Sequence, residues 1–137
     1  MNNTSGGGNL GELLKHMSPE LQSGEYVFLS FNQGGYGDYA ELKPVASFLE
    51  KEGLTLVVNK ETAEQYNHSY SSIFRCITLQ VHSSLEAVGL TAAFATQLTK
   101  YGISANVIAG FYHDHIFVGV DDAGKALDAL QELSRGV

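Results

Sequence analysis

The order of elements that the second half of the chain predicts is the strongest constraint on its fold. Residues 73–82 alternate apolar and polar side chains, as a β-strand with one buried face does. A helix is expected to follow from Ser83, because Ser83 and Glu86 have the spacing of a capping box. Its buried stripe would consist of Leu90, Phe94, Leu98 and Tyr101. A hairpin over 103–120 and a final amphipathic helix complete the order β-α-β-β-α.

The first half of the chain repeats this order in a weaker form. A strand is expected at 25–31, a hairpin from 45–50 and 54–60, and a short helix from about Glu61 to Tyr66. The connection between the strand and the hairpin is a loop, because its glycines interrupt both the helical and the strand period. We interpret the two halves as a degenerate internal repeat that covers most of the chain.

The order β-α-β-β-α is typical of ferredoxin-like folds. The predicted fold class is therefore α/β (α+β), with two tandem halves of antiparallel sheet and helices on one face. Residues 9–70 would form the first half, beginning with a helix capped by Asn9 and Glu12, and residues 71–137 the second. The polar, glycine-rich residues 1–8 are expected to be a disordered tail. Neither half contains an obvious fourth strand, so either the halves share strands or a partner chain completes each sheet.

Charge and cysteine content exclude several classes of protein. The 137 residues carry a net charge of −7 with no basic run, which disfavours binding to nucleic acid and to anionic membranes. The single cysteine, Cys76, has no partner for an internal disulfide, and this favours a reducing, cytoplasmic location. The first residues lack the features of a secretion signal, and no apolar run approaches the ~18 residues of a membrane span.

Residues 82–120 resemble the ACT domain family. The shared pattern is a Gly-Leu pair entering a helix, Gly-Ile-Ser after the helix, and Asp-His at the second strand of the hairpin. These residues are Gly89, Leu90, Gly102, Ile103, Ser104, Asp114 and His115. The stretch VASFLEKEGLTLVV in the first half is similar to the N-terminal partner in tandem-ACT proteins, so the resemblance covers roughly residues 10–135.

This resemblance implies a non-catalytic regulatory protein that binds a small molecule, typically an amino acid, at interfaces between modules, and that forms a homo-oligomer. The loop from the first strand to the first helix would supply one side of the site, and the following strand of a neighbouring module the other. The ligand-binding residues implied in this chain are His82, Ser83, Ser84, Glu86, Val88, Gly89, Leu90, Asn106, Ile108 and Asp114. No cofactor and no metal are predicted.

Elementary chemistry supports such a site but leaves two alternatives open. A helix N-terminus attracts a carboxylate, and Glu86, Asp114 or a backbone carbonyl could meet an ammonium group. Ser83 and Glu86 would, however, equally well only cap their own helix. Gly89 would admit either another backbone or a tightly packed helix.

Catalytic and metal-binding interpretations fit the sequence less well. His113, Asp114 and His115 are acceptable metal ligands, but a polar turn at His113-Asp114 explains them without an ion. Neighbouring His82 and Ser83 do not form a triad, and Cys76 lies mid-strand without a basic group that would activate it. The main alternative is an interaction module that docks a polypeptide on a sheet edge or on the strand face of Cys76, Thr78, Gln80 and His82.

Overall fold

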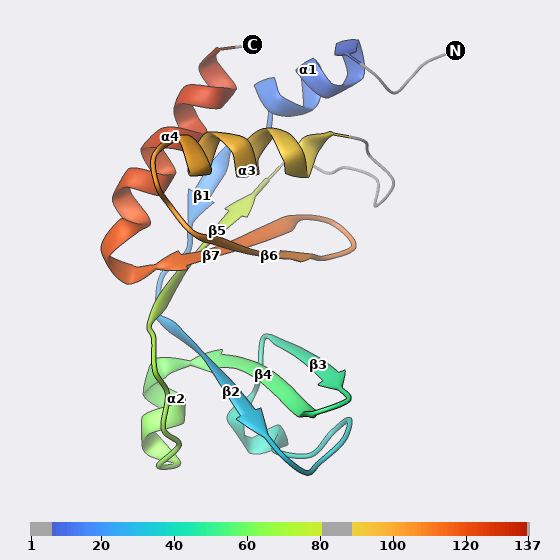
Figure 1. The fold of residues 1–137 in the computed structure, drawn as a ribbon, viewed down its shortest axis with the longest axis vertical. Coiled ribbons are helices and arrows are strands. Elements are labelled where there is room, and N and C mark those ends of the chain that lie inside the picture. Colours follow the sequence, from blue (N-terminus) through green and yellow to red (C-terminus); the bar gives the residue numbers. More distant parts are fainter. Residues whose placement is uncertain (1–6, 81–88, 137) are drawn as a thin grey trace. The chain divides into compact units, whose positions relative to one another are not determined.

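The computed structural model describes residues 7–80 and 89–136, and its ribbon is shown in Figure 1. The chain divides into two compact units. The central unit consists of Ser23–Arg75, and the terminal unit combines Met1–Gln22 with Cys76–Val137. Each unit is described by itself below.

The terminal unit is a four-stranded sheet in the order β1-β5-β7-β6, with helices on one face (Figure 1). Strand β1 pairs antiparallel with β5, and β6 pairs antiparallel with β7. Its elements are α1 (Gly7–Lys15), β1 (Pro19–Leu21), β5 (Phe74–Leu79), α3 (Leu90–Lys100), β6 (Ala105–Ala109), β7 (Asp114–Gly119), the 3₁₀ helix η2 (Val120–Asp122) and α4 (Ala123–Arg135).

The core of the terminal unit lies between this sheet and helices α1, α3 and α4. Leu90, Phe94 and Leu98 are buried as their spacing predicts, whereas Tyr101, at the end of α3, is partly exposed and donates a hydrogen bond to Glu132. The other buried residues of this core are Leu14, Met17, Ile77, Leu79, Ile103, Ile116, Val118, Ala123, Ala126, Ala129 and Leu130.

The central unit is a smaller antiparallel sheet in the order β3-β4-β2, extended by the first residue of β5. Its elements are β2 (Tyr26–Phe31), the 3₁₀ helix η1 (Ala40–Leu42), β3 (Ala46–Glu50), β4 (Gly53–Asn59) and α2 (Lys60–Gln65). Its core consists of Val27, Leu29, Leu42, Leu54, Leu56, Val58 and Ala63. The glycine-rich connection is a loop, as expected, apart from the single turn of η1.

Strand β1 supplies the fourth strand of the terminal unit, whereas the central unit gains only a single residue pair. In the terminal unit, β1 pairs with β5 from Pro19↔Leu79 to Leu21↔Ile77, although β1 precedes the whole central unit in the sequence. In the central unit, Phe74 at the start of β5 pairs with Tyr26 of β2. The compact units interleave along the chain, and the division into repeated halves at 9–70 and 71–137 stays a prediction.

Three expected boundaries need correction. Helix α1 begins at Gly7, so the expected tail over 1–8 is too long and Asn9 is a helical residue rather than a cap. The hairpin turn is Gly110–His113, closed by the Gly110 N–H donating to the His113 carbonyl, and not His113-Asp114. The described part of α3 begins at Leu90, and the capping box expected at Ser83 and Glu86 lies outside the described residues.

The physical reasons for these corrections are local packing and backbone geometry. Burial of Leu14, with Leu10 and Leu13 packed beside it, stabilises α1 despite glycines that disfavour a helix. At Gly110 a Cβ would approach the His113 carbonyl oxygen to 3.1 Å, so glycine suits the tight turn.

Candidate ligand site

The N-terminus of α3 is the feature that most resembles a ligand site. Gly89 is its N-cap residue, with φ 91°, and among residues 7–80 and 89–136 no side chain accepts a hydrogen bond from the first turn. The first turn also contains no acidic residue, and both Thr91 and Ala92 are exposed. Within the described part of the chain, the first N–H groups of α3 therefore have no side-chain acceptor, and the positive end of the helix dipole would favour an anionic group.

Gly89 and Leu90 themselves serve the packing of the helices. A Cβ at Gly89 would lie 3.1 Å from a methyl group of Leu10 in α1, and Leu90 is buried in the core of the terminal unit. Of the two alternatives for Gly89, the structure shows the one in which a helix packs tightly against it. Leu90 as a whole residue is only 3% exposed, so it contributes little to an accessible surface.

Asn106 and Ile108 lie on the face of the sheet away from the helices. They pair with Phe117 and His115, whereas Val107 pairs with the core residue Ile116. Alternate residues of a strand point to opposite faces. Within the terminal unit the structure therefore does not bring Asn106 and Ile108 together with the side chain of Leu90. The amide of Asn106 donates to the Phe117 carbonyl oxygen at 3.2 Å.

Asp114 occupies the first position of β7, opposite Ala109. It is half-buried, and this burial raises the pKa of its carboxyl group, against the opposing influence of His115 and His113. The remaining predicted ligand-binding residues, His82, Ser83, Ser84, Glu86 and Val88, lie outside the described residues.

Cys76 and Thr78 of β5 and His115 of β7 form a row of buried or half-buried polar side chains. Their mutual contact was not predicted from the sequence. Thr78 is only 5% exposed, and its Oγ1 lies 2.9 Å from Nδ1 of His115 and 3.8 Å from Sγ of Cys76. Burial lowers the pKa of His115, so its neutral form is favoured. Burial also raises the pKa of the Cys76 thiol, which disfavours the reactive thiolate.

The burial of Cys76 and Thr78 argues against a docking surface for a polypeptide on this face of β5. Cys76 is 6% exposed and Thr78 is equally inaccessible, so neither is available on an open docking face. Gln80 is exposed and donates to Glu20 at 2.5 Å.

Asp114 and His115, as neighbours in β7, point to opposite faces, and the described residues contain no group of three His, Cys, Asp or Glu side chains placed to hold a metal ion.

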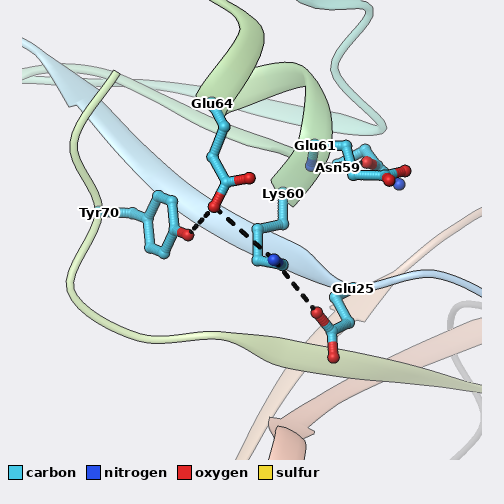
Figure 2. A network of polar contacts seen from close by, with 6 residues as sticks. All are labelled: Glu25, Asn59, Lys60, Glu61, Glu64 and Tyr70. Atoms are coloured by element: carbon cyan, nitrogen blue, oxygen red, sulfur yellow. Dashed lines mark hydrogen bonds and ion pairs between the residues drawn. The ribbon is translucent and has the colours of Figure 1, made fainter. Parts of the chain in front are cut away.

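The central unit carries a cluster of titratable groups that Figure 2 shows. Nζ of Lys60 lies 3.6 Å from Glu25 and 3.7 Å from Glu64, and Tyr70 donates a hydrogen bond to Glu64. The Glu64 charge raises the pKa of Lys60, and the Tyr70 hydrogen bond lowers the pKa of Glu64. The i, i+4 spacing of Lys60 and Glu64 was the sequence signal for this pair.

This network joins the residue that precedes β2, helix α2 and the connector that follows α2. The side-chain oxygen of Asn59 caps α2 by accepting from the Glu61 N–H at 2.9 Å. Because Lys60, Glu25, Glu64 and Tyr70 all have partners within the network, its role is to hold these elements together, and it needs no ligand.

Models of known protein families match most of the sequence. Two family models of the ACT domain match the sequence, over residues 5–75 and 71–132. The chain belongs to the ACT domain family. This family consists of regulatory modules, which supports a regulatory, ligand-binding role. No protein with a curated description matches the sequence significantly.

Solved structures include a similar protein from Vibrio cholerae, described as of unknown function and a possible transport protein. It is 58% identical, with a TM-score of 0.83, over 91% of this chain and 95% of that chain. The ligand-free regulatory subunit of aspartate kinase from Thermus thermophilus is 9% identical, with a TM-score of 0.64, over 86% of this chain and 97% of that chain. At this identity the second likeness concerns the ACT fold alone.

The lengths and the apolar character of the helices test whether they could span a membrane. Within 7–80 and 89–136, no helix combines the length and the apolar character that crossing a bilayer requires.

Proposed function

We propose that this ACT protein binds a free amino acid, or a metabolite of similar size, as a regulatory signal, and that it catalyses no reaction. The ligand carboxylate would bind at the start of α3, and the outer strand of a second copy of the chain would supply the opposing surface. A homo-oligomer in the cytoplasm is the setting that suits this proposal. Binding would transmit a signal by favouring one arrangement of the subunits over another.

The observation that carries this proposal is the N-terminus of α3, for which the described residues supply no side-chain cap. An 11-residue helix with no acidic first turn and no capping side chain among these residues has amide groups that water or a ligand could satisfy. Because the chain belongs to the ACT domain family, which consists of regulatory modules, we favour a ligand over water as the partner of these amide groups. The regulatory subunits of aspartate kinase share this fold, and their description as regulatory supports a regulatory role for a chain built from the same modules.

The experiment places a competing carboxylate at this helix terminus. Thr91 is exposed in the first turn of α3, so Thr91→Glu adds a negative charge where the helix dipole favours it. Without ligand, we expect the free energy of unfolding to rise by about 0.3–1 kcal/mol. The increase in melting temperature that one of the twenty amino acids produces for the unmodified protein should be lost in this variant.

Thr96→Glu is the matched control, because Thr96 is an exposed threonine in the middle of the same helix. It makes the same change of charge away from the helix end and should retain the ligand-induced shift. The proposal is wrong if no amino acid raises the melting temperature of the unmodified protein, or if Thr91→Glu responds as Thr96→Glu does.

One observation favours the alternative of an interaction module. The outer strand β3 exposes Phe48 to 71% and Leu49 to 61%, which is unusual for large apolar side chains on a monomer. If the amino-acid panel has no effect while the chain binds a polypeptide through β3, this alternative replaces the first proposal.

A further inference from the structure

A shallow, largely open pocket of about 340 Å³ lies on the surface of the terminal unit, where the end of α4 meets the turn between α1 and β1, and both Ser18 and Arg135 are exposed there. It is lined by Ser18, Pro19, Gln131, Ser134 and Arg135. This volume is at the lower end of the range for pockets that hold small molecules. None of the lining residues belongs to the start of α3 or to β6, so the pocket is separate from the candidate ligand site.

The side chains around this pocket offer unused hydrogen-bonding groups. Within the described residues, the side chains of Ser18, Gln131 and Arg135 have no hydrogen-bond or ion-pair partner. Arg135 does lower the pKa of Glu132, but that carboxylate is already engaged by Tyr101 and lies outside the pocket lining. A hydroxyl, an amide and a guanidinium around one small pocket are a donor set for an oxygen-rich anion.

The wall that carries Arg135 is held in place. The hydroxyl of Ser134 donates to the Lys15 carbonyl oxygen at 3.0 Å, which ties the last turn of α4 to the end of α1. The opposite wall includes Ser18, whose φ of 40° is uncommon for a residue with a side chain and is further disfavoured by the proline that follows. Such strain often marks positions that the surrounding structure holds for function.

The charges around the pocket narrow the class of ligand. The carboxyl-terminal ends of α1 and α4 both lie here, and their carbonyl groups carry partial negative charge. Arg135 provides a localised positive charge whose planar shape matches a carboxylate. A large polyanion would meet both helix ends and a chain of net charge −7, whereas a single carboxylate avoids most of this repulsion.

We propose that this pocket binds a small carboxylate-bearing metabolite of amino-acid size through the guanidinium of Arg135. Ser18 and Gln131 would donate hydrogen bonds to the carboxylate or to neighbouring polar groups, and the ring of Pro19 would contact its carbon atoms. An ammonium group on the same ligand would be favoured by the helix ends. This second site is independent of ligand binding at the start of α3.

The test is an amide NMR titration of the full chain with three probes: sodium acetate, glycine and inorganic phosphate. Acetate and glycine should produce saturable shifts at Ser18, Gln131 and Ser134. Arg135→Gln should weaken this binding at least about tenfold, because it removes a charge-assisted pair. Lys125→Gln, which removes an exposed charge from the other end of α4, should leave the affinity unchanged.

Several results would overturn the proposal. Shifts that do not saturate, or that Arg135→Gln leaves at full strength, would show that no built site exists. Saturable binding of phosphate alone would assign the pocket to a different anion. The Thr91→Glu variant should leave this titration unchanged. If this variant no longer binds acetate and glycine at the pocket, the pocket is not a separate site.

A second variant tests the pocket without removing a charge. Ser18→Gly should relieve the backbone strain and raise the melting temperature, while weakening carboxylate binding several-fold through loss of the hydroxyl. Ser30→Gly, at an exposed position in strand β2, is the control and should lower the melting temperature. If Ser18→Gly binds acetate and glycine as well as the unmodified protein does, Ser18 has no part in the site and the pocket as proposed is wrong.

Discussion

Thr78 and His115 illustrate how single residues couple the strands of the terminal unit. Their side chains meet at 2.9 Å although they are far apart in the sequence, and His115 is half-buried. Burial is the largest influence on the pKa of His115, and the charge of His113 lowers it further, whereas Asp114 raises it. The folded protein therefore favours neutral His115.

This preference predicts how stability depends on pH. In the unfolded chain His115 has a pKa of about 6.5, which is higher than in the folded protein, so the unfolded state binds the proton more readily. The free energy of unfolding should fall as the pH drops from about 7.5 to about 5.5. Asp114 acts in the opposite direction, but nearer the ordinary pKa of a carboxyl group and thus at lower pH.

Urea denaturation at several pH values measures this effect. His115→Gln should flatten the decline between pH 7.5 and 5.5, whereas His16→Gln, at an exposed position at the end of α1, should leave it unchanged. An unaltered slope in His115→Gln would show that burial of this imidazole does not contribute to the pH dependence.

At the scale of elements, strand β3 is notable for large apolar side chains that are exposed to solvent. It is the outer strand of the central unit and pairs only with β4, leaving one edge of backbone groups without a strand partner within that unit. Its neighbour β4 buries Leu54, Leu56 and Val58, whereas β3 exposes Phe48 and Leu49. Exposed apolar edge strands associate readily with other chains.

We therefore expect Phe48→Lys to weaken self-association without weakening the fold. Phe48 is largely exposed, so the free energy of unfolding of the monomer should change by no more than about 0.5 kcal/mol. Sedimentation over a range of protein concentrations should show a shift toward monomer. Tyr36→Lys changes an aromatic residue that is 97% exposed in a loop and is the matched control. Equal association of both variants would exclude β3 from the oligomer contact.

At the scale of the whole molecule, the two units are interleaved along the chain. Helix α1 and strand β1 precede the central unit but complete the terminal unit, where Met17 and Leu14 are part of the core. We therefore expect the second half of the sequence to depend on residues 7–22 for its sheet and its core. Its sheet lacks a strand, and its core lacks one helix, when residues 7–22 are absent.

A fragment of residues 71–137 should therefore fail to fold. Removing β1 and α1 leaves Ile77 and Leu79 without the residues that cover them, and a small unit cannot offset that exposure. Circular dichroism and amide NMR should show a largely unfolded fragment. A circular permutant that attaches residues 7–22 through a flexible linker should fold cooperatively, and a stable fold of the bare fragment would contradict this account.

The sequence by itself determined the identity and order of most elements. Alternation of apolar residues located β5 and β7, helical spacing located α3 and its buried face, and the motif around Gly89-Leu90 indicated the ACT family that the family models confirm. These properties follow from local periodicity, because each strand or helix must bury one face whatever it packs against.

Only the tertiary structure decided which strand completes which sheet and which polar residues meet. The sequence left strand sharing and a partner chain open as alternatives, and in the terminal unit β1 supplies the fourth strand from within the chain. Nothing in the spacing places Thr78 beside His115, or Arg135 beside Ser18. Such contacts depend on the path of the chain between distant segments, and free energy of packing over the whole unit, rather than local preference, selects that path.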